Sequence, residues 1–149
     1  MTKILVPIDF SDSTPRVLDA ALNLARSLDA HLILLHVVEP VTQFVGGEAA
    51  FDIIQAPVTP SLDRPTQDLA RQASHLQEKG IQTSSVITTG LPVDDILEES
   101  DKHSVDYIVL GSHGHGALYH LFSGSVVNGV LHGAHCPVIV VPATDKKEA

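Results

Sequence analysis

The sequence predicts an α/β fold, a three-layer open sheet of five parallel strands in the order 3-2-1-4-5. Short apolar runs alternate with segments of helical spacing along the 149 residues, of which 44% are hydrophobic and only 4% aromatic. Aliphatic runs of this kind are typical of buried parallel strands, and alternation with helices implies right-handed crossovers. Residues suited to a ligand follow the first and fourth runs, which predicts that these two strands are neighbours. We expect residues 1–149 to form one domain.

Each expected element has a local signal. The five strands are predicted from their apolar runs at Ile4–Ile8, Leu32–Val38, Ile81–Thr88, Val105–Leu110 and Pro137–Pro142. A first helix is expected after Ser13 or Thr14 as N-cap, with Pro15 at its first position, because these residue types favour helix starts. The other helices are expected at Gln67–Lys79 (closed by Gly80), Pro92–Lys102 and Val126–Leu131.

The connection from Val41 to Pro65 is unusually long for a strand-to-helix link. It contains Phe44, Phe51 and Ile53, so it is too apolar for a solvated linker. We expect either a short helix or cover packed on the domain or on a partner subunit, or a locally packed surface loop.

The most specific motif is Gly111-Ser112-His113-Gly114, followed after nine residues by Gly124-Ser125. Glycines at the end of a strand leave the backbone open to a ligand. We expect Gly124-Ser125 to open the last helix, where free N–H groups and the helix dipole attract anions. These residues, here called the phosphate cradle, predict a bound nucleotide. The alternative is that the glycines serve only a turn and a helix start.

The charges around the phosphate cradle favour holding a nucleotide over cleaving it quickly. No Lys or Arg occurs from Gly111 to Cys136, so phosphates would meet backbone N–H groups, hydroxyls and histidines. Fixed cations that stabilise phosphoryl transfer are missing from this stretch, and a divalent metal would have to neutralise most of the phosphate charge. No Walker A loop, dinucleotide fingerprint or catalytic constellation occurs in the sequence.

Two further residues at strand ends have two interpretations each. Asp9 can accept hydrogen bonds from a ribose or base or reach a phosphate-bound metal, or it can cap the turn Asp9-Phe10-Ser11-Asp12. Val37 can offer backbone groups and an apolar wall to a flat base, or it can be a core residue.

Composition excludes several classes of protein. The formal net charge of −9 argues against nucleic acid and anionic membranes as partners. The single cysteine, Cys136, excludes an intrachain disulfide and a cysteine-based zinc site. The nine histidines lack a recognised metal-binding spacing, so exposed or hydrogen-bonded histidines are favoured and no metal ligand is assigned. No run approaches the length of a membrane span, and we expect a cytoplasmic protein.

The chain resembles the universal stress protein family over Ile4 to Pro142. The resemblance rests on Val6-Pro7-Ile8-Asp9-Phe10-Ser11, on Leu34-Leu35-His36-Val37-Val38, and on the phosphate cradle followed by Pro137-Val138-Ile139-Val140-Val141-Pro142. The spacing of the phosphate cradle is that of the family's ATP-binding branch, with its adenine-nucleotide-binding fold.

The resemblance implies a role for each matching residue. Pro7, Asp9 and Val37 would surround the nucleoside, and Leu110 and Gly111 would lie near the ribose and first phosphate. The phosphates of ATP, with Mg²⁺ or Mn²⁺, would be held by Ser112, His113, Gly114, Gly124, Ser125 and Val126. The family implies a homodimer through the last strand, Pro137 to Pro142, with a higher oligomer left open.

Three functions follow as hypotheses. The first is a regulatory, stress-response protein whose bound ATP sets dimer and partner contacts, with little or slow hydrolysis; a transporter or an enzyme would fit as the regulated protein. The second is an ATP hydrolase or another nucleotide-dependent enzyme on the same fold. The third is an interaction module that ignores nucleotides.

Overall fold

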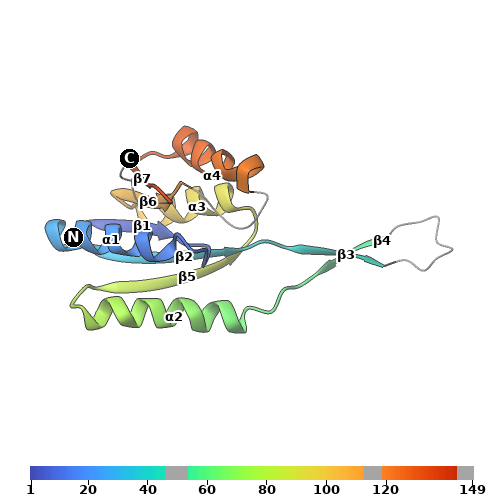
Figure 1. Cartoon of the computed structure of the whole chain (residues 1–149), viewed down its shortest axis with the longest axis horizontal. Coiled ribbons are helices and arrows are strands. Elements are labelled where there is room, and N and C mark those ends of the chain that lie inside the picture. Colours follow the sequence, from blue (N-terminus) through green and yellow to red (C-terminus); the bar gives the residue numbers. More distant parts are fainter. Residues whose placement is uncertain (46–53, 113–118, 144–149) are drawn as a thin grey trace, which may run out of the picture.

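A parallel five-stranded sheet with helices on both faces forms the body of the protein in the computed structural model (Figure 1). The structure describes residues 1–45, 54–112 and 119–143. The strand order is β5-β2-β1-β6-β7. Counted along the chain without the hairpin strands, this is the predicted order 3-2-1-4-5, and all its pairings are parallel. The predicted fold class is confirmed.

The strands of the sheet are short and largely apolar. They are β1 (Lys3–Pro7), β2 (His31–Val38), β5 (Thr83–Thr89), β6 (Tyr107–Gly111) and β7 (Val138–Val141). The central strands β1, β2 and β6 carry side chains buried from both faces. Such burial explains why these runs are apolar throughout and do not alternate with polar residues.

Among the described residues, four helices cover the sheet, namely α1 (Thr14–Leu28), α2 (Asp63–Glu78), α3 (Pro92–His103) and α4 (Tyr119–Gly133). Ser13 is the N-cap residue of α1, as the sequence predicts, and Pro15 lies in its first turn. Gly80 has a φ of +85° directly after the C-cap residue of α2, a conformation that glycine adopts without strain.

The helices divide between two hydrophobic cores, one on each face of the sheet. One core joins α1 and α2 to residues such as Ile4, Leu34 and Val109. The other joins α3 and α4 to residues such as Leu35 and Ile108. This arrangement gives the predicted three layers, and it places every strand's carboxyl end and every helix start at one edge of the sheet, here called the carboxyl edge.

Two helices begin earlier than the sequence predicts. Helix α2 starts at Asp63, four residues before the expected Gln67. Helix α4 starts at Tyr119, seven residues before the expected Val126, so it includes Gly124 and Ser125. A glycine inside a helix costs only about 1 kcal/mol relative to alanine, so it need not mark a helix boundary.

The long connection after β2 forms a hairpin in its described part, so the expectation of a short helix is wrong, and packing on a partner subunit stays a prediction. Strand β3 (Val41–Val45) pairs antiparallel with β4 (Ile54–Val58), and Val41 lies opposite Val58. The hairpin extends away from the sheet and its helices (Figure 1). The segment is apolar because it is rich in strand-forming residues.

Candidate functional site at the carboxyl edge

The carboxyl edge brings together side chains that lie far apart in the sequence. Pro7 ends β1 and pairs in register with Leu35 of β2. Val37 and Val126 both pack against the α3–α4 core, to which the buried Leu110 of β6 belongs. Val37 of β2, Leu110 of β6 and Val126 of α4 therefore lie on the same face of the sheet.

The loop that leaves β1 is held by its own hydrogen bonds. The backbone N–H of Ser11 donates to Asp9 Oδ1 over 3.0 Å. The hydroxyl oxygens of Ser11 and Ser13 lie 2.9 Å apart. Asp9 therefore has the turn-capping role that the sequence offered as one of two interpretations, and a contact with a ligand stays a prediction.

His36 and Phe10 support this loop, and sequence reasoning assigned neither of them to the site. His36 Nδ1 donates to the carbonyl oxygen of Ile8 over 2.8 Å. The ring of Phe10 lies 4.7 Å from that of His36, centroid to centroid. Phe10 has a φ of +58°, which is strained for a residue with a side chain. The ring contact and the surrounding hydrogen bonds hold the loop in this conformation.

The end of β6 is tied to the end of β7. Gly111 pairs with Val141, and the N–H of Ser112 donates to the carbonyl oxygen of Val141 over 2.8 Å. The hydroxyl oxygen of Ser112 accepts a hydrogen bond from the N–H of Ala143 over 3.2 Å. The position of Ser112 is therefore fixed by its contacts with β7 and with Ala143.

The rest of the phosphate cradle is only partly described. His113 and Gly114 lie outside the described residues. Gly124 and Ser125 lie inside α4 and do not open it, so the expectation that they are the helix start is wrong. The N–H groups that a helix leaves free are those of its first turn, which in α4 begins at Tyr119.

Three buried side-chain oxygens in the described residues have no hydrogen-bond partner: Thr14 Oγ1, Thr88 Oγ1 and Asp95 Oδ2. All three lie at the carboxyl edge, because Thr14 begins α1, Thr88 precedes the last residue of β5, and Asp95 lies in the first turn of α3. Leaving such an atom unpaired costs about 1–3 kcal/mol, so unpaired buried oxygens are uncommon in folded proteins. Thr14 lies on the face of the sheet that carries α1, whereas Thr88 and Asp95 lie on the face that carries α3.

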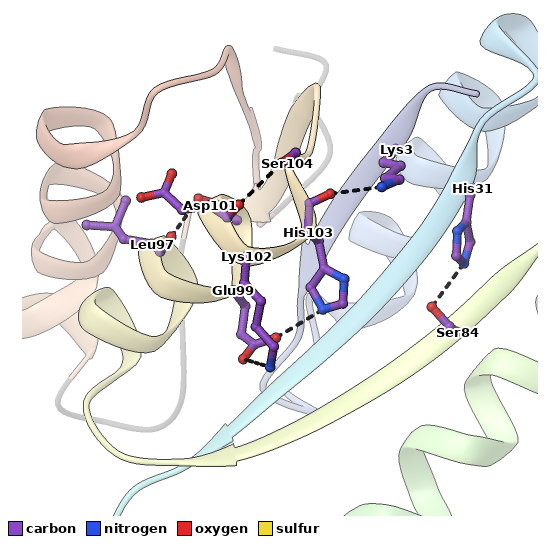
Figure 2. Close-up of polar contacts among 10 residues, drawn as sticks. Lys3, His31, Ser84, Leu97, Glu99, Asp101, Lys102, His103 and Ser104 are labelled. Carbon is purple, nitrogen blue, oxygen red and sulfur yellow. Dashed lines mark hydrogen bonds and ion pairs between the residues drawn. The ribbon is translucent and has the colours of Figure 1, made fainter.

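The opposite, amino edge of the sheet holds a polar cluster that satisfies its own hydrogen bonds (Figure 2). Glu99 is only 5% exposed, and its carboxylate accepts from Lys102 Nζ at 2.9 Å and lies 3.1 Å from His103 Nε2. Lys3 Nζ donates to the carbonyl oxygen of His103 over 3.0 Å. This cluster joins the end of α3 to the start of β1.

Two groups near the amino edge have shifted pKa values. Burial, followed by the charges of Lys3 and His103, lowers the pKa of His31, whose Nε2 lies 2.9 Å from Ser84 Oγ. Burial, followed by the charge of Asp101 and then that of Asp106, raises the pKa of the Cys136 thiol. The free cysteine is therefore less acidic than an ordinary thiol and is not an activated nucleophile.

Across the described residues, no three His, Cys, Asp or Glu side chains are grouped so that they could hold a metal ion. None of the helices within residues 1–45, 54–112 and 119–143 combines the length and apolar character needed to cross a membrane.

Comparison with known proteins identifies the family. The sequence profile described as "Universal stress protein family" matches residues 1–142. The chain belongs to the universal stress protein family. Among its relatives, universal stress protein MJ0531 of Methanocaldococcus jannaschii is 31% identical over 148 residues, which cover 97% of this chain and 84% of that protein.

Solved structures of universal stress proteins share this fold. A universal stress protein in complex with cAMP superposes with a TM-score of 0.70 at 22% identity, covering 96% of this chain and 98% of that one. The Archaeoglobus fulgidus universal stress protein in complex with dAMP gives 0.65 at 23% identity, covering 95% and 98%. At these identities the likeness establishes the common fold.

Proposed function

We propose that this universal stress protein binds ATP at the carboxyl edge of its sheet and that the bound nucleotide sets its contacts with a second copy and with a regulated protein. The observation that carries the proposal is the position of Thr14, Thr88 and Asp95, whose unpaired buried oxygens all lie at this edge. The cAMP and dAMP complexes of two relatives support an adenine nucleotide as the ligand.

The proposed contacts are those that the resemblance to the family implies. Pro7, Asp9 and Val37 surround the nucleoside, and Leu110 and Gly111 lie near the ribose and first phosphate. The phosphates are held by Ser112, His113, Gly114, Gly124, Ser125 and Val126. Mg²⁺ or Mn²⁺ travels with the phosphates, because the stretch from Gly111 to Cys136 supplies no Lys or Arg to neutralise their charge.

The proposed role is regulatory. The absence of Lys and Arg between Gly111 and Cys136 leaves the phosphates without a fixed cation from that segment, so hydrolysis is slow or absent. We expect the protein to act in the cytoplasm during the stress response, with a transporter or an enzyme as the regulated protein.

Calorimetric titration with ATP and Mg²⁺, with AMP as a control, tests nucleotide binding. We expect a Kd for ATP at or below about 100 μM, roughly −5.5 kcal/mol.

A pair of variants on α4 tests the site itself. Val126→Glu places a charge at the site and should abolish binding. The control is Leu131→Glu on the same helix, since Leu131 is 50% exposed; this variant should bind ATP normally.

Other outcomes contradict the proposal. If the titration with ATP gives no heat, and neither ATP nor AMP binds in a competition experiment, the chain is an interaction module that ignores nucleotides. If ATP turns over faster than about 1 s⁻¹, the chain is an ATP hydrolase.

The proposed dimer forms through β7, the strand at one end of the sheet order. Ile139 and Val140 are each 36% exposed, although both are apolar. An unpaired edge strand with exposed apolar side chains favours pairing with another chain. Ile139→Lys should convert the dimer to a monomer in light-scattering measurements. Leu28→Lys, at a similarly exposed apolar position on α1 (38%), should leave the dimer intact.

A further inference from the structure

Two of the unpaired oxygens at the carboxyl edge lie close to the residue expected to contact the base. Thr88 of β5 pairs in register with Val37 of β2. Register partners in neighbouring strands point to the same face of a sheet, so Thr88 lies on the α3 face beside Val37. Asp95 lies in the first turn of α3, next to Ile96, which belongs to the same core as Val37.

The position of the Asp95 carboxylate is set by a glycine. A Cβ at Gly90 would lie 2.7 Å from Asp95 Oδ1 and 2.8 Å from Oδ2. The carboxylate thus occupies the space that a side chain at position 90 would need. Gly90 is itself held to β2, because its N–H donates to the carbonyl oxygen of Val38 over 3.1 Å. The carboxylate is therefore held over the turn that follows β5, beside the end of β2.

Within the described part of the chain, neither oxygen has a hydrogen-bond partner. Thr88 Oγ1 and Asp95 Oδ2 are buried without a hydrogen-bond partner, so they do not bond to each other. Both residues are only half-buried overall, so each side chain reaches the surface while its named oxygen is enclosed. Because both oxygens are enclosed, contact with a ligand at this edge requires a change of side-chain torsion at each residue.

We propose that Thr88 and Asp95 select the base of the bound nucleotide by its exocyclic amino group. A carboxylate accepts hydrogen bonds and donates none, whereas a threonine hydroxyl can also donate. Asp95 then accepts a hydrogen bond from the 6-amino group of adenine, and Thr88 donates to a ring nitrogen. A 6-oxo purine would place a carbonyl oxygen against the carboxylate and is disfavoured. This inference rests on the proposed binding of ATP at the carboxyl edge.

The test compares ATP with two analogues in calorimetric titrations of the full chain. Purine riboside triphosphate lacks the 6-amino group, and inosine triphosphate carries a 6-oxo group in its place. The wild type should bind ATP about tenfold or more tightly than either analogue. Asp95→Ala should reduce this preference to about twofold or less, and Thr88→Val should weaken ATP binding several-fold.

Matched controls separate base recognition from loss of structure. Asp94→Ala changes the exposed neighbour in the same helical turn, and it should leave the preference for ATP unchanged. Thr83 lies on the same strand as Thr88, and its hydroxyl donates to the carbonyl oxygen of Ile81 over 3.0 Å. The substitution Thr83→Val therefore removes a hydroxyl that already has a hydrogen-bond partner. It should lower the melting temperature without altering base preference, whereas Thr88→Val should not lower it.

The outcomes distinguish this inference from the proposed function. If the wild type binds no ATP, both are wrong. If the wild type binds ATP without preferring it, or if Asp95→Ala keeps the preference over the two analogues and Thr88→Val keeps the wild-type affinity for ATP, only the role of Thr88 and Asp95 is wrong. If the preference disappears in Asp95→Ala and ATP binding weakens in Thr88→Val, while both controls keep the preference and the affinity, the inference is supported.

Discussion

The Nδ1 atom of His36 lies 2.8 Å from the carbonyl oxygen of Ile8, so a side chain of β2 holds the first residue that follows β1. The backbone makes a second link at the same point, because the N–H of Ile8 donates to the carbonyl oxygen of Leu35 over 2.8 Å. The loop from Ile8 to Ser13 is therefore held by contacts within the protein, and these contacts also place Asp9.

Replacing His36 with leucine should loosen this loop. The variant lacks the hydrogen bond from His36, so the carbonyl oxygen of Ile8 loses this partner. We therefore expect the free energy of unfolding to fall by about 1–3 kcal/mol. Urea denaturation measures this loss, and ATP affinity should fall with it. His132 is exposed and bonds to the carbonyl oxygen of Asn128 on its own helix, so His132→Leu should cost less than about 0.5 kcal/mol. Equal losses in the two variants would contradict the role of His36.

The buried carboxylate of Glu99 should contribute measurably to stability. Glu99→Gln keeps the shape of the side chain but removes the charge that faces Lys102 and His103. We expect the free energy of unfolding to fall by about 1–3 kcal/mol. Asp68→Asn is the control, because Asp68 pairs with the exposed Arg71 at the surface and such pairs contribute little. If Asp68→Asn lowers the free energy of unfolding as much as Glu99→Gln does, the burial of Glu99 is not the reason for its contribution to stability.

Stability should fall in mild acid because of His31. Burial and the neighbouring positive charges lower its pKa in the folded protein, so the unfolded chain binds the proton more tightly. The contribution of His31 to stability is therefore complete above about pH 6.5, and it is lost as the pH falls through the lowered pKa. Unfolding midpoints measured from pH 7.5 to 5 should drop less steeply in His31→Gln than in the wild type. His75→Gln, at an exposed position on α2, should keep the wild-type slope.

Cys136 should react slowly with thiol reagents at neutral pH. The raised pKa of its thiol lowers the fraction of thiolate, the reactive form. We expect Ellman's reagent to react more slowly with the folded protein than with the unfolded chain, and the rate to rise with pH. Asp101→Asn removes one of the charges that raise the pKa and should speed the reaction. A folded-state rate equal to that of the unfolded chain would contradict this assignment.

Helices α3 and α4 approach closely through a glycine. A Cβ at Gly129 would lie 2.7 Å from Val93 Cγ2, so Gly129→Val should force the helices apart and cost about 1–3 kcal/mol. Because α4 also carries Val126, ATP affinity should fall as well. Asn128→Val, at an exposed neighbouring position, is the control and should change neither thermal stability nor affinity appreciably.

The sheet order was predictable because ligand-suited residues follow two separate apolar runs, and only adjacent strands bring them to one site. The start of α4 was not predictable in the same way. Gly124 suggests a boundary, yet the modest helix penalty of glycine is outweighed by the packing of the helix as a whole. The hairpin was missed because the apolar character of Val41–Val45 was attributed to packing, although its residue types also favour a strand.

Thr88 and Asp95 could not be found from the sequence for a different reason. Asp95 follows Asp94 in the first turn of a helix, where carboxylates are common because they interact favourably with the helix dipole. Whether an oxygen of Asp95 is enclosed depends on Gly90 and on the end of β2. Only the folded chain brings these segments together. Burial of a single atom is a tertiary property and leaves no pattern in the sequence.

The pairing of Val41 with Val58 means that the chain leaves and re-enters the body of the protein at nearly the same point. Cross-strand partners lie only about 5 Å apart. A segment inserted between them therefore has to bridge only this short distance and does not require the sheet to move. A shorter turn, a longer hairpin or an entire foreign domain could be grafted at this position while the carboxyl edge keeps its geometry. The hairpin between Val41 and Val58 can thus be replaced by another recognition element while the sheet and its helices stay unchanged.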